Sequence, residues 1–390
     1  MSPAKTAKLA RDGVARLGIL VNPVAGMGGP LALHGTDGEA MTAAVALGAQ
    51  PTAELRMRRA LESLGRRHPG PIEILTAPGS MGADAVVSAG LEVAGELAAP
   101  TSADATTADD TRRAALDAVE ADVDLLLFGG GDGTATDIAR VVGDRTVVLG
   151  VPSGVKMHSG VFAIDPERAG RIAAAYLQSP TPRPQREAEV VDVPTDELSP
   201  RTIERTLVPR ISGIQNPKAS AASDDAGIAA LGVRLAEEMQ PDRLYLIGPG
   251  RSAGAVLDAL GLAGTRNGVD AVIDGRIVAL DAAEPQLLDL VRHHSRPVLV
   301  LGVVGGQGFL LGRGNQQLSA QVLAHIHSDD LIIVAAADKV SALQPPVLHV
   351  DLGPAARPPT LRGYRTVRTA PARSVMLRIE DEPIHTGEPV

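Results

Sequence analysis

One carboxylate inside a glycine-rich loop is the feature of this sequence best suited to chemistry. An apolar segment at 125–128 leads directly into Gly129-Gly130-Gly131-Asp132-Gly133-Thr134. Consecutive glycines leave backbone N–H groups accessible, and a helix beginning near Thr134 would direct its positive end at an anion held there. Asp132 could accept a proton from a substrate hydroxyl or hold a Mg²⁺ ion against phosphate oxygens. The pattern predicts a phosphate site with Asp132 as its catalytic residue.

A purely structural role is the alternative for Asp132, because a carboxylate at a helix start can serve only as a cap. The substitution Asp132→Asn separates the two interpretations. If the side chain is exposed, the change should alter stability by about 0.5 kcal/mol or less. If Asp132 is a general base, turnover should fall roughly 10²–10⁴-fold.

A second glycine-rich loop follows the first apolar segment, at 17–21. It runs from Asn22 to Gly29 and is followed by Gly35-Thr36-Asp37-Gly38. The carboxyl ends of parallel strands meet at one edge of a sheet, so this loop and the Asp132 loop can converge on one crevice. A tight turn that contacts no ligand is the alternative. The expected nucleotide-binding residues of the two loops are Asn22, Gly26, Gly28, Thr36, Asp37, Gly38, Gly130, Gly131, Gly133 and Thr134.

A third loop carries a lysine and a histidine. Lys156 and His158 follow the apolar segment 147–151 within a stretch that contains Ser and Gly. Loops at a strand end commonly carry function, so both side chains are expected to enter the same crevice and contact phosphate. A solvated lysine and an incidental loop histidine are the alternative.

Two further glycine-rich loops lie in the second half of the chain. Gly248-Pro249-Gly250 separates a predicted strand from a predicted helix, and residues 305–317 combine glycines with an arginine and several amides. Such a composition suits a phosphate together with a base or ribose edge, although glycine also punctuates ordinary turns. If functional, these loops bind the second substrate, through Gly248, Gly250, Gly306, Gln307, Gly308, Arg313, Asn315 and Gln316.

Three aspartates surround a predicted hairpin whose strands are 269–274 and 277–280. Asp270, Asp274 and Asp281 are expected to be turn carboxylates that face solvent, with metal binding as the minority interpretation.

The elements that position these loops alternate between strand and helix. A polar extension at 1–15 precedes a doubly wound α/β domain over about residues 16–180, in which residues 80–97 are expected to be helical. The proline-rich segment 179–184 forms a boundary. Residues 185–390 form a β-rich region carrying a second α/β unit at about 225–355, and the tail segments 366–367 and 375–379 are expected to return to the β segment at 187–211.

Composition excludes several classes of partner. The chain has 390 residues, a formal net charge of −9, three Phe, three Tyr and no Trp. Nucleic-acid binding needs a basic surface and aromatic stacking platforms, so it is not expected. With no Cys and no apolar segment long enough to span a bilayer, we expect a cytoplasmic protein without a membrane partner and without disulfides or thiolate chemistry. Small nucleotides are the expected ligands, and a homo-oligomer is the expected state.

The motifs together resemble those of NAD kinases and their relatives in the diacylglycerol-kinase and phosphofructokinase superfamily. Across almost the whole chain, the resemblance is to a longer branch of ATP-NAD kinase-like proteins related to the acetoin-catabolism protein X group. The segments that carry it are 22–29, 35–38, 130–134, 150–159, 189–192, 248–250 and 305–317. The resemblance implies an N-terminal NAD-kinase-like domain and transfer of phosphate from ATP, with Mg²⁺, to the 2′-hydroxyl of the adenosine ribose of NAD, giving NADP.

The sequence departs from this pattern at several positions. His34 stands where the resemblance predicts Lys, and Arg251-Ser252 stand where it predicts hydroxyl residues. An Asn-Glu or Asn-Asp pair that shorter NAD kinases use to hold the nicotinamide-side ribose has no clear match. These departures leave two alternatives open, namely a kinase of another small metabolite hydroxyl and a non-catalytic nucleotide-binding regulator of an acetoin-type catabolic pathway. The donor, ATP or polyphosphate, also stays open.

Overall fold

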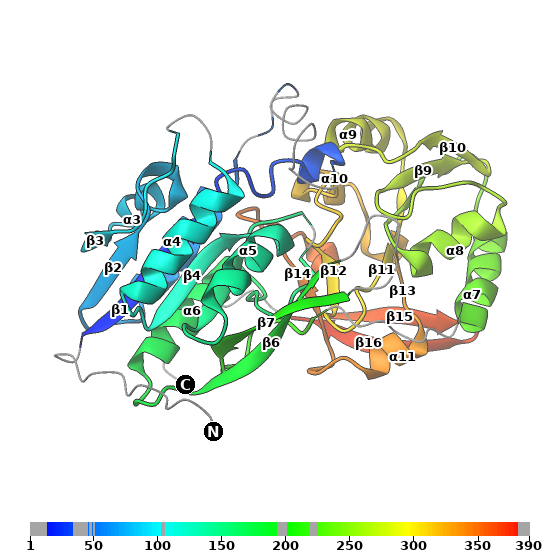
Figure 1. Cartoon of the computed structure of the whole chain (residues 1–390). Coiled ribbons are helices and arrows are strands. Elements are labelled where there is room, and N and C mark those ends of the chain that lie inside the picture. The colour runs from blue at the N-terminus through cyan, green and yellow to red at the C-terminus, as the bar shows by residue number, and fades with distance from the viewer. Residues whose placement is uncertain are drawn as a thin grey trace.

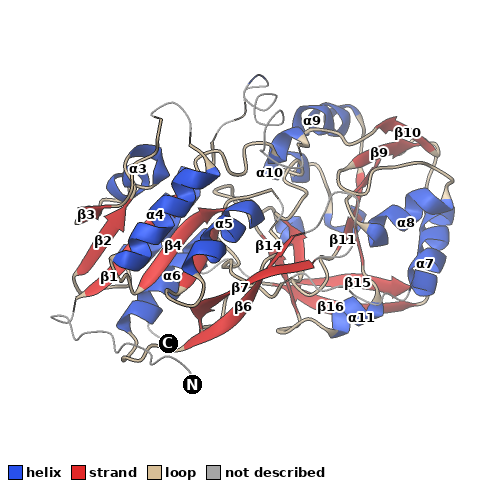
Figure 2. Ribbon diagram, in the orientation of Figure 1, coloured by secondary structure: helices blue, strands red, loops and turns tan. Residues whose placement is uncertain are grey.

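The computed structural model describes residues 14–33, 46, 49, 51–102, 106–155, 157–192, 201–217 and 225–380. Two sheets flanked by helices lie side by side, with a two-stranded ribbon between their lower ends (Figures 1 and 2). This is a mixed α/β architecture, as the alternating pattern predicts.

The N-terminal sheet has five parallel strands in the order β3-β2-β1-β4-β5. Its strands are β1 (Ala15–Val21), β2 (Ile72–Thr76), β3 (Gly95–Glu96), β4 (Leu125–Gly130) and β5 (Val148–Pro152). The helices are α2 (Ala53–Gly65), α3 (Ala83–Ser88), α4 (Ala108–Glu120), α5 (Asp132–Val142) and α6 (Pro166–Gln178). Side chains alternate across β4, so that Leu125 and Leu127 pack with α2 and α6 whereas Leu126 and Phe128 pack with α4 and α5. The domain is therefore doubly wound.

The order in which strands are added to this sheet reverses between β1 and β4. The chain adds β2 and β3 on one side of β1, and β4 and β5 on the other. Strand β1 pairs with β2 on one side and with β4 on the other. The carboxyl ends of β1 and β4, which carry the two glycine-rich loops, are thus neighbours. In open α/β sheets this topological switch point is where ligands bind.

An antiparallel ribbon of β6 (Gln185–Asp192) and β7 (Arg201–Pro209) follows α6. Ala188, Val190 and Val208 are buried in one core with Phe128 and Phe162. The ribbon therefore packs on the N-terminal domain, although its residues follow the boundary expected at 179–184.

The C-terminal sheet has nine strands in the order β10-β9-β8-β11-β13-β15-β16-β14-β12. They are β8 (Tyr245–Ile247), β9 (Asp270–Ile273), β10 (Arg276–Ala279), β11 (Val298–Gly302), β12 (Phe309–Leu311), β13 (Leu331–Val334), β14 (Val347–Val350), β15 (Tyr364–Ala370) and β16 (Arg373–Ile379). Strands β8, β11 and β13 are parallel neighbours, and β9 and β10 form the predicted hairpin. The accompanying helices are α7 (Asp225–Glu238), α8 (Arg251–Ala259), α9 (Glu284–His293), α10 (Ala320–Leu323) and α11 (Ala337–Ser341).

One predicted helix and one predicted strand pairing are wrong, although the tail strands themselves are confirmed as β15 and β16. The helix expected over 80–97 ends at Ser88, because Gly90 adopts a φ of +73°, and the chain then adds β3 to the sheet edge. The tail does not return to the ribbon of β6 and β7. Strands β15 and β16 pair with each other between β13 and β14, where Val367, Leu377 and Ile379 are buried in the C-terminal core. Among the described residues, no helix is long and apolar enough to cross a membrane.

Candidate functional site

The loops that follow β1 and β4 meet at the switch point, as the sequence predicts. The Asn22 side-chain Nδ2 donates a hydrogen bond to Thr134 Oγ1 at 3.0 Å. The Asn22 backbone N–H donates to the Gly129 carbonyl at 2.9 Å. The side chain of Asn22 therefore joins the loop to the start of α5.

The loop after β5 packs closely, backbone to backbone, against the loops after β1 and β4. The N–H groups of Ser153 and Gly154 both donate to the Gly130 carbonyl, each at 3.0 Å. A Cβ on Gly154 would lie 2.7 Å from the Gly131 Cα, and a Cβ on Gly26, whose φ is +81°, would lie 2.1 Å from the Ser153 carbonyl oxygen. These glycines permit three loops to pack backbone to backbone.

The other glycines of the site differ in what surrounds them. A Cβ on Gly130 would meet the Thr134 side chain at 2.5 Å, whereas a Cβ on Gly133 would find nothing within 4 Å. The buried Gly28 accepts hydrogen bonds at its carbonyl from the N–H groups of Leu31 and Leu33. Gly133 therefore lies beside open space in the first turn of α5, and a helix start can receive an anion.

Asp132 is the first residue of α5 and its carboxylate faces the loop after β5. Oδ2 accepts the His158 backbone N–H at 2.7 Å, and Oδ1 accepts the Ser159 N–H at 3.0 Å and the Ser159 hydroxyl at 2.6 Å. The His158 ring lies beside the same carboxylate, with Nδ1 3.3 Å from Oδ2. Both side chains are 14% exposed. The protein therefore holds the carboxylate in one orientation and leaves a small part of it accessible.

This geometry corrects the expectation that Asp132 resembles an ordinary exposed residue. Both carboxylate oxygens face donors, so an asparagine in either amide orientation would place its NH₂ group against an N–H or O–H group with which it cannot form a hydrogen bond. Loss of a partner at such a partly buried position costs about 1–3 kcal/mol. The residue has a structural role as well as the proposed chemical one.

The amide-rich loop of the C-terminal domain reaches this part of the N-terminal domain. Gln316 Nε2 donates to the Val155 carbonyl at 2.7 Å, and the Gly314 N–H donates to the same oxygen at 3.0 Å. Gln307 Nε2 lies 3.1 Å from the Met157 carbonyl oxygen and 3.3 Å from that of His158. Residues 305–317 thus contact the loop that holds Asp132.

The comparisons with known families agree with this arrangement of two domains. The model of the ATP-NAD kinase N-terminal domain matches residues 17–180, and that of the ATP-NAD kinase C-terminal domain matches residues 247–379. The chain belongs to the NAD kinase-like family. No match was found among the curated proteins or among the solved structures. Family membership makes the chain a phosphotransferase of the kinase class.

Arg313 is placed differently from the expectation for this NAD kinase-like chain. Its guanidinium is buried, with 3% of the side chain exposed, and lies 3.9 Å from the centre of the Phe309 ring. It donates to the carbonyls of Gly312 and Ile164, at 3.0 and 3.1 Å. Burial lowers the pKa of Arg313 to about 10, which still leaves it charged at neutral pH. Its donors are engaged inside the protein, so it serves the contact between the domains and is not open to a phosphate.

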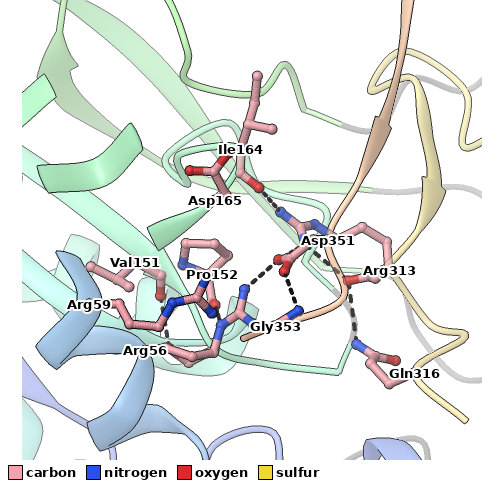
Figure 3. Close-up of polar contacts among 12 residues, drawn as sticks. Arg56, Arg59, Val151, Pro152, Ile164, Asp165, Arg313, Gln316, Asp351 and Gly353 are labelled. Atoms are coloured by element: carbon pink, nitrogen blue, oxygen red, sulfur yellow. Dashed lines mark hydrogen bonds and ion pairs between the residues drawn. The ribbon is translucent and has the colours of Figure 1, made fainter. Parts of the chain in front are cut away.

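Asp351 anchors Arg313 and joins it to the N-terminal domain. Figure 3 shows the Asp351 carboxylate between Arg313 and Arg56 of α2, with which it forms ion pairs. Arg56 also donates to the Pro152 carbonyl at the end of β5. Burial by itself raises the pKa of Asp351, but the charges of Arg56 and Arg313 outweigh it and lower that pKa to about 2.

The other candidates of the second half have local contacts. Asn315 is buried and holds its own loop, accepting the Gly312 N–H at 2.8 Å and donating to the Leu310 carbonyl at 2.9 Å. Positive φ angles at Gly250, Gly306 and Gly308 form the turns after β8 and β11. The Gly248 N–H pairs with the Val300 carbonyl. These glycines shape the edge of the C-terminal sheet, and ligand binding there stays a proposal.

Four expected site residues, Thr36, Asp37, Gly38 and Lys156, lie outside the described residues.

Asp270 corrects the expectation of a solvent-facing turn residue. It is 0% exposed, and its carboxylate accepts the N–H groups of Thr265 and Asp281, at 2.6 and 2.8 Å. Burial raises its pKa, and the two backbone donors oppose that shift. Asp270 therefore joins two loop segments at the beginning of β9.

A resident metal centre has no ready ligand set among the described residues, where no group of three or more His, Asp or Glu side chains could hold an ion. This fits Mg²⁺ that arrives with a nucleotide, because such ions take one or two carboxylates plus phosphate oxygens. Such an ion would be held mainly by phosphate oxygens, because the Asp132 carboxylate already accepts three hydrogen bonds.

Three residues of the site were missed by the sequence analysis. Ser159 lies in the segment 150–159, which the family resemblance includes, and that segment was a signal for its hydroxyl. Arg56 lies on an ordinary amphipathic helix, and Gln215 follows β7 without any motif. Their partners are distant in sequence, and the pattern near each residue carried no signal.

Proposed function

We propose that the protein transfers the terminal phosphoryl group of ATP, with Mg²⁺, to the 2′-hydroxyl of the adenosine ribose of NAD. The observation that carries the proposal is the Asp132 carboxylate, oriented by His158 and Ser159 at the switch point of the sheet and next to the open space at Gly133. The membership of both domains in the NAD kinase-like family supports the choice of acceptor.

Phosphoryl transfer needs mainly positioning and neutralisation of charge. When bound, Mg²⁺ would supply positive charge that offsets the negative charge of the phosphates. The N–H groups of Gly130, Gly131, Gly133 and Thr134, with the positive end of α5, attract the phosphates. Asn22, Gly26 and Gly28 shape the loop beside them.

Asp132 acts on the acceptor hydroxyl. A carboxylate has about four lone-pair sites, and the His158 and Ser159 groups occupy three of them. The remaining site accepts the hydrogen bond of the 2′-hydroxyl. It takes the proton of that hydroxyl as the new oxygen–phosphorus bond forms and the bond between the terminal phosphorus and the bridging oxygen breaks, so that ADP leaves with the electron pair of the broken bond. The His158 ring, 3.3 Å from Oδ2, is the neighbour that can then receive that proton.

The experiment is a coupled assay of the purified chain with ATP, Mg²⁺ and NAD, in which an NADP-specific dehydrogenase reports the product. Formation of NADP that is abolished by Asp132→Asn supports the proposal. ADP formation with another hydroxyl compound, but not with NAD, would move the assignment to a different acceptor. A folded chain whose melting temperature rises with ATP or NAD, yet which forms no ADP with any acceptor, would be a nucleotide-binding regulator.

Polyphosphate replaces ATP in a parallel assay. NADP formed from ATP alone supports the donor proposed here, and NADP formed from polyphosphate alone contradicts it.

A further inference from the structure

Gln215 is buried directly behind the loop that holds Asp132. The residue follows β7, is 3% exposed, and has no role in the proposed reaction. Its Nε2 group donates to the Met157 carbonyl at 3.0 Å and to the Ser159 carbonyl at 2.9 Å. One side-chain amide therefore holds the backbone on both sides of His158.

Arg313 determines which way the Gln215 amide points. Nε and Nη2 of Arg313 lie 3.4 and 3.3 Å from Gln215 Oε1. An arginine has donors and no acceptor, so the amide oxygen of Gln215 must face it. The NH₂ group of the amide then faces the carbonyls of the loop. Asp351 and the Ile164 carbonyl hold Arg313 in place.

Gln307 adds a second support from the C-terminal domain. Its Nε2 lies within 3.3 Å of the carbonyl oxygens of Met157 and His158. The three successive carbonyls of residues 157–159 are thus held by two glutamine amides, while the N–H groups of His158 and Ser159 are directed to Asp132. The loop is fixed from both sides.

We propose that Gln215 is a positioning residue for Asp132, and that Arg313 and Gln307 make this positioning depend on the docking of the C-terminal domain. The catalytic part of this inference rests on the proposed function, whereas the structural part does not. Since a displacement of about 1 Å from productive geometry can cost roughly 10²-fold in rate, release of the loop should reduce turnover more than ligand binding.

The decisive variants are Gln215→Glu and Gln215→Met. Glutamate keeps an acceptor for Arg313 but cannot donate to the two carbonyls when ionised, and methionine keeps the length of the side chain without either function. We expect kcat to fall roughly 10²-fold while the dissociation constant for ADP changes less than about 3-fold, because the glycine N–H groups are unchanged. The matched control is Gln178→Glu, which removes a similar bond, from Nε2 to the Arg67 carbonyl, at an exposed site.

A double-mutant comparison tests whether Gln215 acts through Asp132. In the Asp132→Asn background, the further change Gln215→Glu should lower kcat by less than about 3-fold, since coupled residues are not additive. An unchanged kcat in both single Gln215 variants, or an undiminished loss in the Asp132→Asn background, would overturn the positioning role while leaving the proposed function intact.

Hydrogen exchange gives a readout that needs no turnover. In Gln215→Met, the peptide containing His158 and Ser159 should exchange roughly 10-fold faster or more, as expected when local opening becomes easier, and in Gln178→Glu it should not change. Unaltered exchange in Gln215→Met would refute the structural part of the inference. If Asp132→Asn itself keeps full turnover, the proposed catalytic role fails, and this exchange result still decides whether Gln215 fixes the loop.

Discussion

Ser159 donates both its backbone N–H and its hydroxyl to a single oxygen of Asp132, at 3.0 and 2.6 Å. The two residues come from loops that follow neighbouring parallel strands, β5 and β4. The contact ties the start of α5 to the loop after β5 and fixes the direction of the carboxylate. A group that performs proton transfer gains from such fixed orientation.

Asp132→Asn should lower both activity and stability. We expect turnover to fall roughly 10²–10⁴-fold, because the amide cannot take a proton. The free energy of unfolding should fall by about 1–3 kcal/mol, because the NH₂ group of the asparagine faces donors with which it cannot form a hydrogen bond. NADP formation and urea unfolding followed by circular dichroism measure the two effects. Ser159→Ala is the control, since it removes one donor and retains the carboxylate. Near wild-type turnover of Asp132→Asn would show that Asp132 is only a structural link.

The substitution Gly133→Ala tests whether Gly133 faces a bound nucleotide or has only a structural role. Its methyl group meets nothing within 4 Å, so the free energy of unfolding should rise by about 0.4–1 kcal/mol, as for a compatible Gly→Ala change. If a phosphate occupies the open space beside this residue, ADP should bind at least several-fold more weakly, because the methyl group would take up part of that space. Gly154→Ala is the comparison, since its Cβ would lie 2.7 Å from the Gly131 Cα and should cost about 1–3 kcal/mol. Unchanged ADP affinity of Gly133→Ala, measured by calorimetry, would contradict a phosphate site there.

His158→Ala tests the proton acceptor next to Asp132. The backbone N–H that holds Oδ2 remains, so the fold should persist. We expect kcat to fall roughly 10²-fold, with little change in the affinity for ADP. The matched control is His293→Ala, whose ring lies at the same distance of 3.3 Å from a carboxylate, that of Asp289, but on an exposed helix. An unaltered kcat in His158→Ala would exclude the proton-transfer role.

Asp351→Asn should weaken the contact between the domains in a pH-dependent way. At neutral pH we expect a loss of about 3 kcal/mol or more, because two arginines keep their charge without the shared carboxylate. The pKa of Asp351 is lowered from 3.8 to about 2 in the folded protein, so its contribution is complete above about pH 5 and declines as the pH falls toward 2. The stability difference between wild type and Asp351→Asn should therefore shrink by about 1 kcal/mol between pH 5 and pH 3.

Urea unfolding at several pH values measures this difference. Asp258→Asn serves as the control, because the Asp258–Arg266 pair is exposed and should contribute less than about 1 kcal/mol. A difference for Asp351→Asn that stays constant down to pH 3 would refute the assigned pKa.

The local sequence was sufficient to predict most helices and strands. It also predicted that the loops after β1 and β4 lie next to each other. The apolar runs of β1 and β4 and the helical periodicity around them predict parallel strands, and the glycines that follow predict loops at one sheet edge. Asn22 and Thr134 are in contact for that reason. The helix expected over 80–97 was wrong because the consequence of a positive φ at Gly90 for the helix end was missed.

Residue type favours proton transfer by Asp132, which stays a prediction, but it did not predict the position of Arg313. A guanidinium in a glycine-rich loop can bind a phosphate only if it points outward. The local sequence is the same whether the side chain points outward or inward. Only the tertiary structure places Arg313 between Asp351, Gln215 and the Ile164 carbonyl. The direction of a side chain depends on partners far away in sequence, and a local pattern contains no information about them.

The sequence by itself determined the α/β class, the glycine-rich loops and the carboxylate at the helix start, because strand and helix periodicity and the conformational freedom of glycine are local properties. The tertiary structure decided that β15 and β16 complete the C-terminal sheet, that Asp270 is buried, and that Ser159 and Gln215 fix the loop around His158. These features arise from burial and from hydrogen bonds between segments that are distant in sequence, such as Gln307 and Met157, which are 150 residues apart, and such contacts form only when the chain folds.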